Sequence, residues 1–340
     1  MSSDPILSVF ALLTLGVILV NGWTDAPNAI STCVSTRAMG LRGAVIMAAV
    51  CNFLGVLVMT SINASVAMTI YNMADLGSDG RAAATALLAA MAAIVIWAVA
   101  AWYFGIPTSE SHALVAGLSG ASVALNGSFS GISAAAWTKV IFGLFLSSAA
   151  GAAMGFFCAK LTRACFAGAD RVRSSRFFAR AEVALGAATA FLHGAQDGQK
   201  FMAVFLLGIS FAGGDTGATS FVVPIPLMII CSAVMGIGTS IGASRIIKSV
   251  GVDMVKLAPY QGFSADIAAS LCLLLSTICG VPVSTTHTKT ASMAGAGAST
   301  RPRNINLGVV RDMLFTWVCT FPGCGLLGFA AAKLFLYLFV

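Results

Sequence analysis

The chain has 340 residues, of which 58% are hydrophobic and only 9% are charged. A soluble domain of this length needs more Lys, Glu, Arg and Asp to cover its surface, so we expect an all-α polytopic membrane protein. The net charge of +7 comes from basic residues gathered in short connections, which is typical of cytoplasmic loops and argues against a nucleic-acid partner. The nine cysteines are scattered without a Cys-x-x-Cys pair, and we expect neither a disulfide framework nor a bound cofactor.

Apolar segments predict the membrane helices in chain order. The first half gives five predicted segments: 5–36 with a polar break at 21–24, 43–71, 82–104, 107–125 and 134–160. The second half repeats the plan: 182–210 with a polar break, 222–242, 258–279, 282–298 and 314–337. We therefore divide the chain into a first transmembrane repeat, a basic cytoplasmic linker and a second transmembrane repeat, over 1–160, 161–181 and 182–340.

The charges of the connections predict the topology. If each segment crosses the membrane, four basic connections fall on one side: 37–42, 160–180, 244–256 and 299–311. Two connections with acidic residues, 72–81 and 212–221, fall on the other. Basic loops stay in the cytoplasm, so we expect a multi-pass protein of the inner or plasma membrane with both termini outside. The short segments 107–125 and 282–298 either span the bilayer or re-enter it.

Two pairs of motifs recur at nearly one spacing. Asp197 follows Asp25 by 172 residues, and His287 follows His112 by 175 residues. With an odd number of crossings in each half, the two copies must have opposite orientations. Two inverted-topology repeats with broken helices are typical of secondary transporters that bind their substrate near the bilayer midplane.

The segments Pro107–His112 and Pro282–His287 both have the composition of a helix start. Pro suits the first turn and Ser or Thr supplies the cap. Free N–H groups and hydroxyls at two converging helix starts would surround a tetrahedral oxyanion with neutral donors. The alternative is that both segments are ordinary caps at the membrane surface.

Asp25 and Asp197 would repel an anion, so they predict a different partner. Carboxylates beside amides and the free carbonyls of a broken helix are ligands for a small cation, or they carry protons. The natural inference is cation-coupled anion transport. The alternative is a structural role in which Asp197 pairs with Lys200 or an aspartate caps a half-helix.

These four motifs resemble the inorganic phosphate transporter (PiT) family, in its bacterial form. Its two repeats each carry a Gly-x-Asn-Asp-x-x-Asn type signature and a Pro-x-Ser-Thr-Thr-His type motif, matched here by Gly22, Asp25 and Asn28, by the stretch 193–200 and by the two helix starts. The resemblance covers nearly the whole chain. It implies symport of inorganic phosphate, free or as a metal–phosphate complex, with Na⁺ or H⁺ as the coupling ion, and it leaves a homodimer open.

The resemblance also implies roles for individual residues. The expected cation-coupling residues are Asp25, Asn28 and Asp197, which would bind Na⁺ if the protein is sodium-coupled. To these we add Glu110, which the resemblance does not supply, as a cation-coupling candidate on its own chemistry. The expected phosphate-binding residues are Ser109, Ser111, Ser284, Thr285, Thr286 and Gln199.

Four positions depart from the family pattern. Thr24 and Gln196 replace the usual Asn, Glu110 replaces a common Thr, and Lys200 stands where the first copy has Asn28. Lys200 would act as the charge partner of Asp197 and remove one cation site. Glu110 would repel phosphate unless it is protonated or turned away, so it is a candidate proton carrier.

Three alternatives compete with phosphate symport. A sulfate transporter of the same family would bind a tetrahedral anion in the same way. An intramembrane serine protease would use Ser119, within Gly117–Gly120, as its nucleophile, but it leaves the duplicated aspartates unexplained. A passive anion channel would need a continuous pore lined by fixed donors.

Overall fold

The structure is a computed structural model that describes residues 5–73, 76–77, 79–104, 108–212, 223–241, 243–300, 303 and 305–340. Pro107, Asp75 and the connection 213–222 lie outside these residues, so the predictions made for them stay untested. Within the described ranges the chain forms helices and no β-strand. The helices of the first half are α1 (Pro5–Thr24), α2 (Ala26–Ala29), α3 (Ser31–Ser35), α4 (Leu41–Ile62), α5 (Ser65–Tyr71), α6 (Gly80–Tyr103), α7 (Glu110–Asn126), η1 (Phe129–Gly131) and α8 (Ala134–Cys165). Those of the second half are α9 (Arg171–Ala212), α10 (Ile225–Ile241), α11 (Ala243–Ile246), the π-helix η2 (Ile247–Met254), α12 (Pro259–Ile278), α13 (Thr285–Ala298) and α14 (Leu307–Phe339).

The all-helical membrane fold that the sequence predicts is confirmed. Six described helices are long and apolar enough to cross a bilayer, and the bent pair formed by α10 with α11 and η2 would make a seventh. α7 has 17 residues and α13 has 14, short of the roughly 20 that a straight span needs. The predicted segment 43–71 is divided at 63–64 into α4 and the short α5.

The first polar stretch breaks its helix, but at Asp25 and not at the predicted residues 21–24, which belong to α1. α1 ends at Thr24, and Asp25 precedes the one-turn helix α2, in which Pro27 stands near the start. Proline has no backbone N–H, so the hydrogen-bond ladder of α1 cannot continue through it.

The second polar stretch does not break its helix, and the prediction of a broken helix over 182–210 is wrong. α9 runs through residues 193–200 without interruption. Gln199 stands where the first copy has Pro27, so the backbone donor is present and the helix continues. The side chain of His193 and that of Gln196 find partners on neighbouring helices: His193 Nδ1 lies 2.9 Å from Asn52 Oδ1, and Gln196 Nε2 donates to Thr277 Oγ1 across 3.1 Å.

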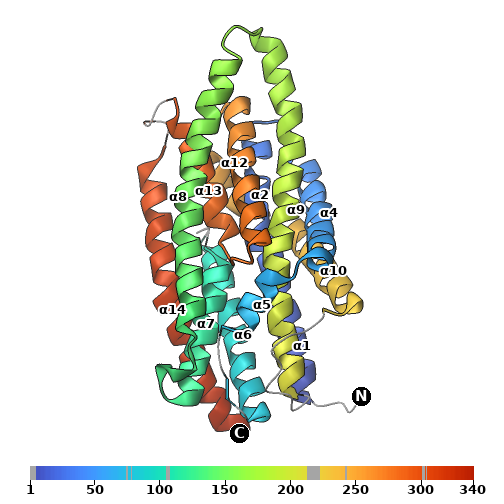
Figure 1. Ribbon diagram of the computed structural model, residues 1–340, viewed down its shortest axis with the longest axis vertical. Helices are drawn as coiled ribbons and strands as arrows, with labels where there is room; N and C mark the ends of the chain where they lie inside the picture. Colours follow the sequence, from blue (N-terminus) through green and yellow to red (C-terminus); the bar gives the residue numbers. More distant parts are fainter. Residues whose placement is uncertain are drawn as a thin grey trace.

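α8 and α9 form a hairpin that extends beyond the rest of the bundle at one end (Figure 1). α8 reaches Cys165 and α9 begins at Arg171, so most of the predicted linker 161–181 is helical and the connection itself is 166–170. The start of α1 and the end of α14 lie at the opposite end of the bundle, and α9 runs in the opposite direction to α1 (Figure 1). Opposite directions are what an inverted repeat requires; the repeat itself stays a prediction.

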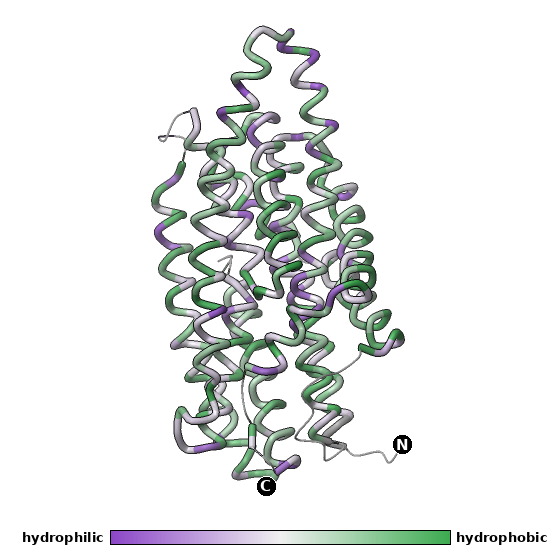
Figure 2. The backbone as a smooth tube through the Cα atoms, viewed as in Figure 1, coloured by the Kyte–Doolittle hydropathy of each residue, from purple (hydrophilic) through white to green (hydrophobic). Residues whose placement is uncertain are grey.

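The short helices α7 and α13 lie in the interior, where the polar residues gather. α7 packs against α6 and α14, and α13 packs against α8 and α12. Hydrophobic positions dominate the long helices that surround them, whereas hydrophilic positions recur along the part of α9 nearest the hairpin (Figure 2). Large apolar side chains face outward on the enclosing helices, among them Phe142 and Phe145 of α8 and Phe315 and Val318 of α14. This outer surface is what a bilayer would contact.

Glycines let the helices that carry the polar residues approach closely. A Cβ at Gly55 of α4 would overlap the carbonyl oxygen of Phe191 of α9, and a Cβ at Gly194 would overlap that of Asn52. The backbones of α4 and α9 are therefore in direct contact beside the second polar stretch, as is common where small residues line membrane helix interfaces.

Candidate functional site

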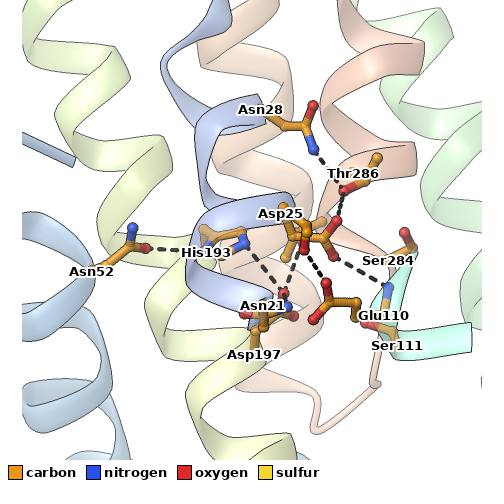
Figure 3. A network of polar contacts seen from close by, with 12 residues as sticks. Asn21, Asp25, Asn28, Asn52, Glu110, Ser111, His193, Asp197, Ser284 and Thr286 are labelled. Atoms are coloured by element: carbon orange, nitrogen blue, oxygen red, sulfur yellow. Dashed lines mark hydrogen bonds and ion pairs between the residues drawn. The ribbon is translucent and has the colours of Figure 1, made fainter. Parts of the chain in front are cut away.

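Four chain segments converge on one buried polar cluster (Figure 3). They are the break after α1, the middle of α9, and the first turns of α7 and α13. The four charged residues of the cluster are each at most 2% exposed: Asp25, Glu110, Asp197 and Lys200. Isolated charges at such depth cost several kcal/mol, so their partners decide what the cluster does.

Asp25 is held by the starts of both short helices. The hydroxyl of Thr286 donates to Asp25 Oδ1 across 3.0 Å, and the backbone N–H of Glu110 donates to Oδ2 across 3.3 Å. Asn28 adds a further bond, because its Nδ2 donates to Thr286 Oγ1 across 3.0 Å. A carboxylate beside the first turn of a helix also interacts favourably with the helix dipole.

Asp197 has a denser set of partners. Lys200, three residues later on α9, places Nζ 2.7 Å from Asp197 Oδ1. On the other oxygen, Oδ2, Asn21 Nδ2 and Thr285 Oγ1 each donate across 3.2 Å, and His193 Nε2 lies 3.2 Å away. Asp197 therefore joins the break after α1 to the start of α13.

Lys200 extends this network to the other helix start. Its Nζ donates to Ser111 Oγ across 2.7 Å and to the backbone carbonyl of Val283 across 2.6 Å. One ammonium thus links α9, α7 and the segment before α13, and its three donors are all used.

The two helix starts are N-capped in the same way. Ser109 Oγ accepts from the N–H of His112 across 3.4 Å, and Ser284 Oγ accepts from the N–H of His287 across 3.2 Å. The two histidine rings meet edge to face with centroids 4.3 Å apart. Both serines are therefore caps, but buried ones, at most 1% exposed, so the starts face the interior of the protein and not the membrane surface.

Three buried oxygens of the cluster have no hydrogen-bond partner among the described residues: Asn21 Oδ1, Asn28 Oδ1 and Glu110 Oε2. The other carboxylate oxygen of Glu110 accepts a bond from the hydroxyl of Thr24. Amide and carboxylate oxygens are hard ligands that suit Na⁺, and an oxygen buried without a donor is an unmet acceptor. The cluster also holds three carboxylates and only one lysine. Both its oxygen ligands and its excess of acidic groups therefore fit a small cation.

Two residues predicted from the sequence lie elsewhere. Gln199 is buried, but its Nε2 donates to the carbonyl of Asn63 across 2.7 Å at the division between α4 and α5. Its role in substrate binding stays a prediction, without a contact to the cluster. Ser119 accepts a bond from Trp137 Nε1 across 2.9 Å, and no histidine among the described residues bonds to it.

A second buried charge network escaped the sequence analysis. Lys289 of α13 forms an ion pair with Asp266 of α12, and Thr32 of α3 donates to that carboxylate across 3.0 Å. Glu182 of α9 lies next to this network, where its Oε2 accepts from Thr36. Asp266 and Lys289 both fall within predicted apolar segments, so the rule that flags Asp25 would have flagged them too.

Comparison with known proteins identifies the family. The profile of the phosphate transporter family matches residues 21–328. A protein of Bacillus subtilis (strain 168), described as a probable low-affinity inorganic phosphate transporter, is 33% identical over 329 residues, covering 95% of this chain and 97% of its own length. A protein of Rhizobium meliloti (strain 1021) with the same description is 32% identical, covering 95% of this chain and 94% of its own.

A solved structure has the same fold. It is titled the sodium-dependent phosphate transporter and superimposes with a TM-score of 0.88 over 99% of this chain and 100% of its own, at 19% identity. The relatives are transporters and not enzymes, which removes the protease alternative. With a family profile that matches most of its length and a relative at 33% identity, the chain belongs to the phosphate transporter family.

Proposed function

We propose that this protein carries inorganic phosphate across the cell membrane together with a cation, Na⁺ or H⁺, by alternating access. The observation that carries the proposal is the direct bonding of the two aspartates to the two helix starts. Thr286 donates to Asp25 and Thr285 donates to Asp197. The hydroxyls expected to bind the anion and the carboxylates expected to bind the cation therefore share one cluster.

This sharing supplies a physical reason for coupling. A phosphate ion that takes the hydroxyls of Thr285 and Thr286 leaves both aspartates short of donors and adds negative charge to the cluster. A cation bound by Asp25 and the oxygens of Asn21 and Asn28 offsets that charge. Binding of the anion and binding of the cation then favour each other, which is the reciprocity that coupled transport needs.

The starts of α7 and α13 lie close together, which supports an alternating-access transporter and argues against a channel. The cavity bounded by Ser111, Lys200 and Ser284 has a volume of only about 10 Å³, room for about one water molecule. Phosphate does not fit this cavity unless α7 and α13 move apart, whereas a channel needs a continuous pore. The helices α7 and α13 pack on different partners, α14 and α8, so each can move with its own neighbours.

Sodium is the coupling ion we favour, since the solved structure with this fold is titled a sodium-dependent phosphate transporter. H⁺ is the alternative coupling ion, and Glu110 is the residue that would carry it, because its carboxyl has one oxygen without a partner among the described residues. We further propose that the α8–α9 hairpin lies on the cytoplasmic side and both termini outside, on the charge pattern of the connections. Whether the substrate is free phosphate or a metal–phosphate complex is decided by adding a chelator to the transport assay.

The test is uptake of radiolabelled phosphate into proteoliposomes that contain the purified protein. A Na⁺ gradient and a pH gradient are imposed separately, with excess sulfate as competitor. We expect Na⁺-driven uptake that sulfate does not block and that Asp25→Asn abolishes. Ser119→Ala is the matched control, because its hydroxyl bonds Trp137 and not the cluster. Uptake blocked by sulfate would assign the protein to sulfate, and uptake indifferent to both gradients would refute coupling.

A further inference from the structure

The end of the bundle that carries the α8–α9 hairpin contains a cavity of about 500 Å³. Its walls come from the last turn of α8, the connection 166–170, the first two turns of α9 and the start of α12. This volume lies within the range of about 300–1,000 Å³ that is typical of small-molecule sites. None of the residues that line the cavity belongs to the buried cluster.

Two arginines give the cavity its charge. Arg163 of α8 and Arg171 of α9 both line it, and neither forms an ion pair with a carboxylate among the described residues. Guanidinium groups hold phosphate through paired N–H donors, and an unpaired arginine has these donors free. The hydroxyls in the wall are additional donors, from Thr162, Ser174, Ser175 and Tyr260.

The backbone adds to the positive potential. α9 begins at Arg171 and α12 begins at Pro259, so the N-terminal ends of a 42-residue and a 20-residue helix both reach the cavity. At the start of α12 the backbone N–H of Ala258 donates to the side chain of Gln261 across 3.0 Å, and Pro259 has no N–H. Each helix end contributes a partial positive charge that attracts anions.

Two negative features lie near the cavity. Asp170, the one carboxylate of the connection, caps α9 by accepting from the N–H of Arg173 across 2.7 Å, and it is not part of the cavity wall. The carbonyls at the C-terminal end of α8 are partly taken as well, since those of Thr162 and Ala164 accept from the N–H groups of residues 166 and 167. The negative charge of Asp170 offsets the partial positive charge at the start of α9, so the positive charge at the cavity comes from Arg163 and Arg171.

We propose that this cavity binds a phosphate ester group, separately from the transport site. Two guanidiniums without an ion pair among the described residues and four hydroxyls around one cavity match a dianionic or monoanionic phosphoryl group. The group can belong to an anionic phospholipid or to a soluble phosphate ester. Phe166 and Phe177, exposed by 40% and 53% beside the cavity, would contact lipid in the first case. A phosphoryl group bound in the cavity would fix the hairpin to α12. α12 in turn packs against α13, the helix that carries Thr285 and Thr286.

Two probes distinguish the sources. Phosphatidylglycerol retention by the full-length protein is measured by native mass spectrometry against phosphatidylcholine, and binding of glycerol phosphate, its soluble headgroup, is measured by calorimetry in detergent. The pocket variant is Arg163→Ala with Arg171→Ala. The matched control is Arg173→Ala with Arg176→Ala, which removes the same charge from the same hairpin at positions that do not line the cavity. Circular dichroism reports whether each variant keeps its helices.

We expect the pocket variant to lose affinity for one or both probes by at least about tenfold, the equivalent of one charge-assisted hydrogen bond, while the control stays within about twofold. Binding of the lipid alone, the ester alone or both assigns the source. A second variant, Ser174→Ala with Ser175→Ala, keeps the charge and the helices, and we expect it to weaken binding by about threefold. Equal losses in the pocket and control variants would reduce the effect to surface charge and overturn the proposal, as would the absence of binding by the unmodified protein.

Discussion

Thr286 at the start of α13 and Asp25 in the break after α1 are joined directly, by a hydrogen bond of 3.0 Å between residues 261 positions apart. The hydroxyl is the donor and the carboxylate is the acceptor. The bond therefore joins a hydroxyl that we propose binds the anion to a carboxylate that we propose binds the cation. It also connects elements from the two halves of the chain.

The first prediction concerns this bond. Replacing Thr286 with Val removes the hydroxyl at nearly constant volume, and a hydrogen bond to a charged group contributes about 1.5–3 kcal/mol. We expect the KM for phosphate to rise by about 10- to 100-fold in proteoliposome uptake. Thr286→Ser keeps the hydroxyl and is the control, for which we expect a change of less than about threefold. Equal loss in both variants would mean that the methyl group and not the hydroxyl matters.

The second prediction concerns the pair of Lys200 and Asp197, whose charged atoms lie 2.7 Å apart with side chains at most 1% exposed. Removing one partner leaves an uncompensated buried charge, at a cost of about 3–5 kcal/mol. We expect Lys200→Met alone to lower the thermal midpoint in detergent strongly. The double variant Lys200→Met with Asp197→Asn should recover most of the stability without recovering transport. A double variant no more stable than the single one would show that the two residues act independently.

The third prediction uses the contact between α4 and α9. A methyl group at Gly55 would overlap the carbonyl oxygen of Phe191, which is backbone and cannot rotate away. We expect Gly55→Ala to destabilise the protein by about 1–3 kcal/mol through overpacking, measured as a lower thermal midpoint. Gly16→Ala in α1 is the control, because no atom lies within 4 Å of the added carbon. A stable Gly55→Ala protein would mean that the two helices are farther apart than described.

The fourth prediction tests Gln199. Its amide donates to the carbonyl of Asn63 across 2.7 Å and forms no hydrogen bond with Asp25 or Asp197 among the described residues. We expect Gln199→Leu to lower stability by about 1–3 kcal/mol, the cost of leaving a buried acceptor without its donor. The KM for phosphate in the protein that remains folded should stay within about twofold, in contrast to Thr286→Val. A large rise in KM would restore the role that the family resemblance implies.

Much of the fold follows from the sequence because hydrophobic length and loop charge are local properties. The helix starts at Ser109 and Ser284 are likewise visible, since a serine before a buried turn is a cap signal. Whether a polar stretch breaks its helix depends on single residues within it, and the spacing of the repeats does not reveal these. Pro27 in the first copy removes a backbone donor, whereas Gln199 in the second copy keeps one, so only α1 is interrupted.

The partners of the polar residues could not be predicted, because they come from distant parts of the chain. Lys200 reaches Ser111 and Val283 as well as Asp197, and only the packed structure brings these together. The pair of Asp266 and Lys289 is an omission of a different kind. Both residues stand in apolar segments, where a charge always needs a partner, and their opposite signs would have suggested that they meet.

The last prediction concerns Glu110 and the coupling ion. Its carboxyl accepts a bond from Thr24 through one oxygen, while the other has no partner among the described residues, and its own N–H binds Asp25. If Glu110 carries a proton during transport, lowering the external pH should accelerate uptake by the unmodified protein, and Glu110→Gln should remove that acceleration. Because Gln keeps the shape and the acceptor for Thr24, the variant should retain uptake driven by a Na⁺ gradient. Asp170→Asn, at the hairpin, is the control for a general effect of losing a carboxylate. A Glu110→Gln protein that keeps its full pH dependence would exclude proton carriage by Glu110 and leave the charge of the cluster to be offset by Na⁺ alone.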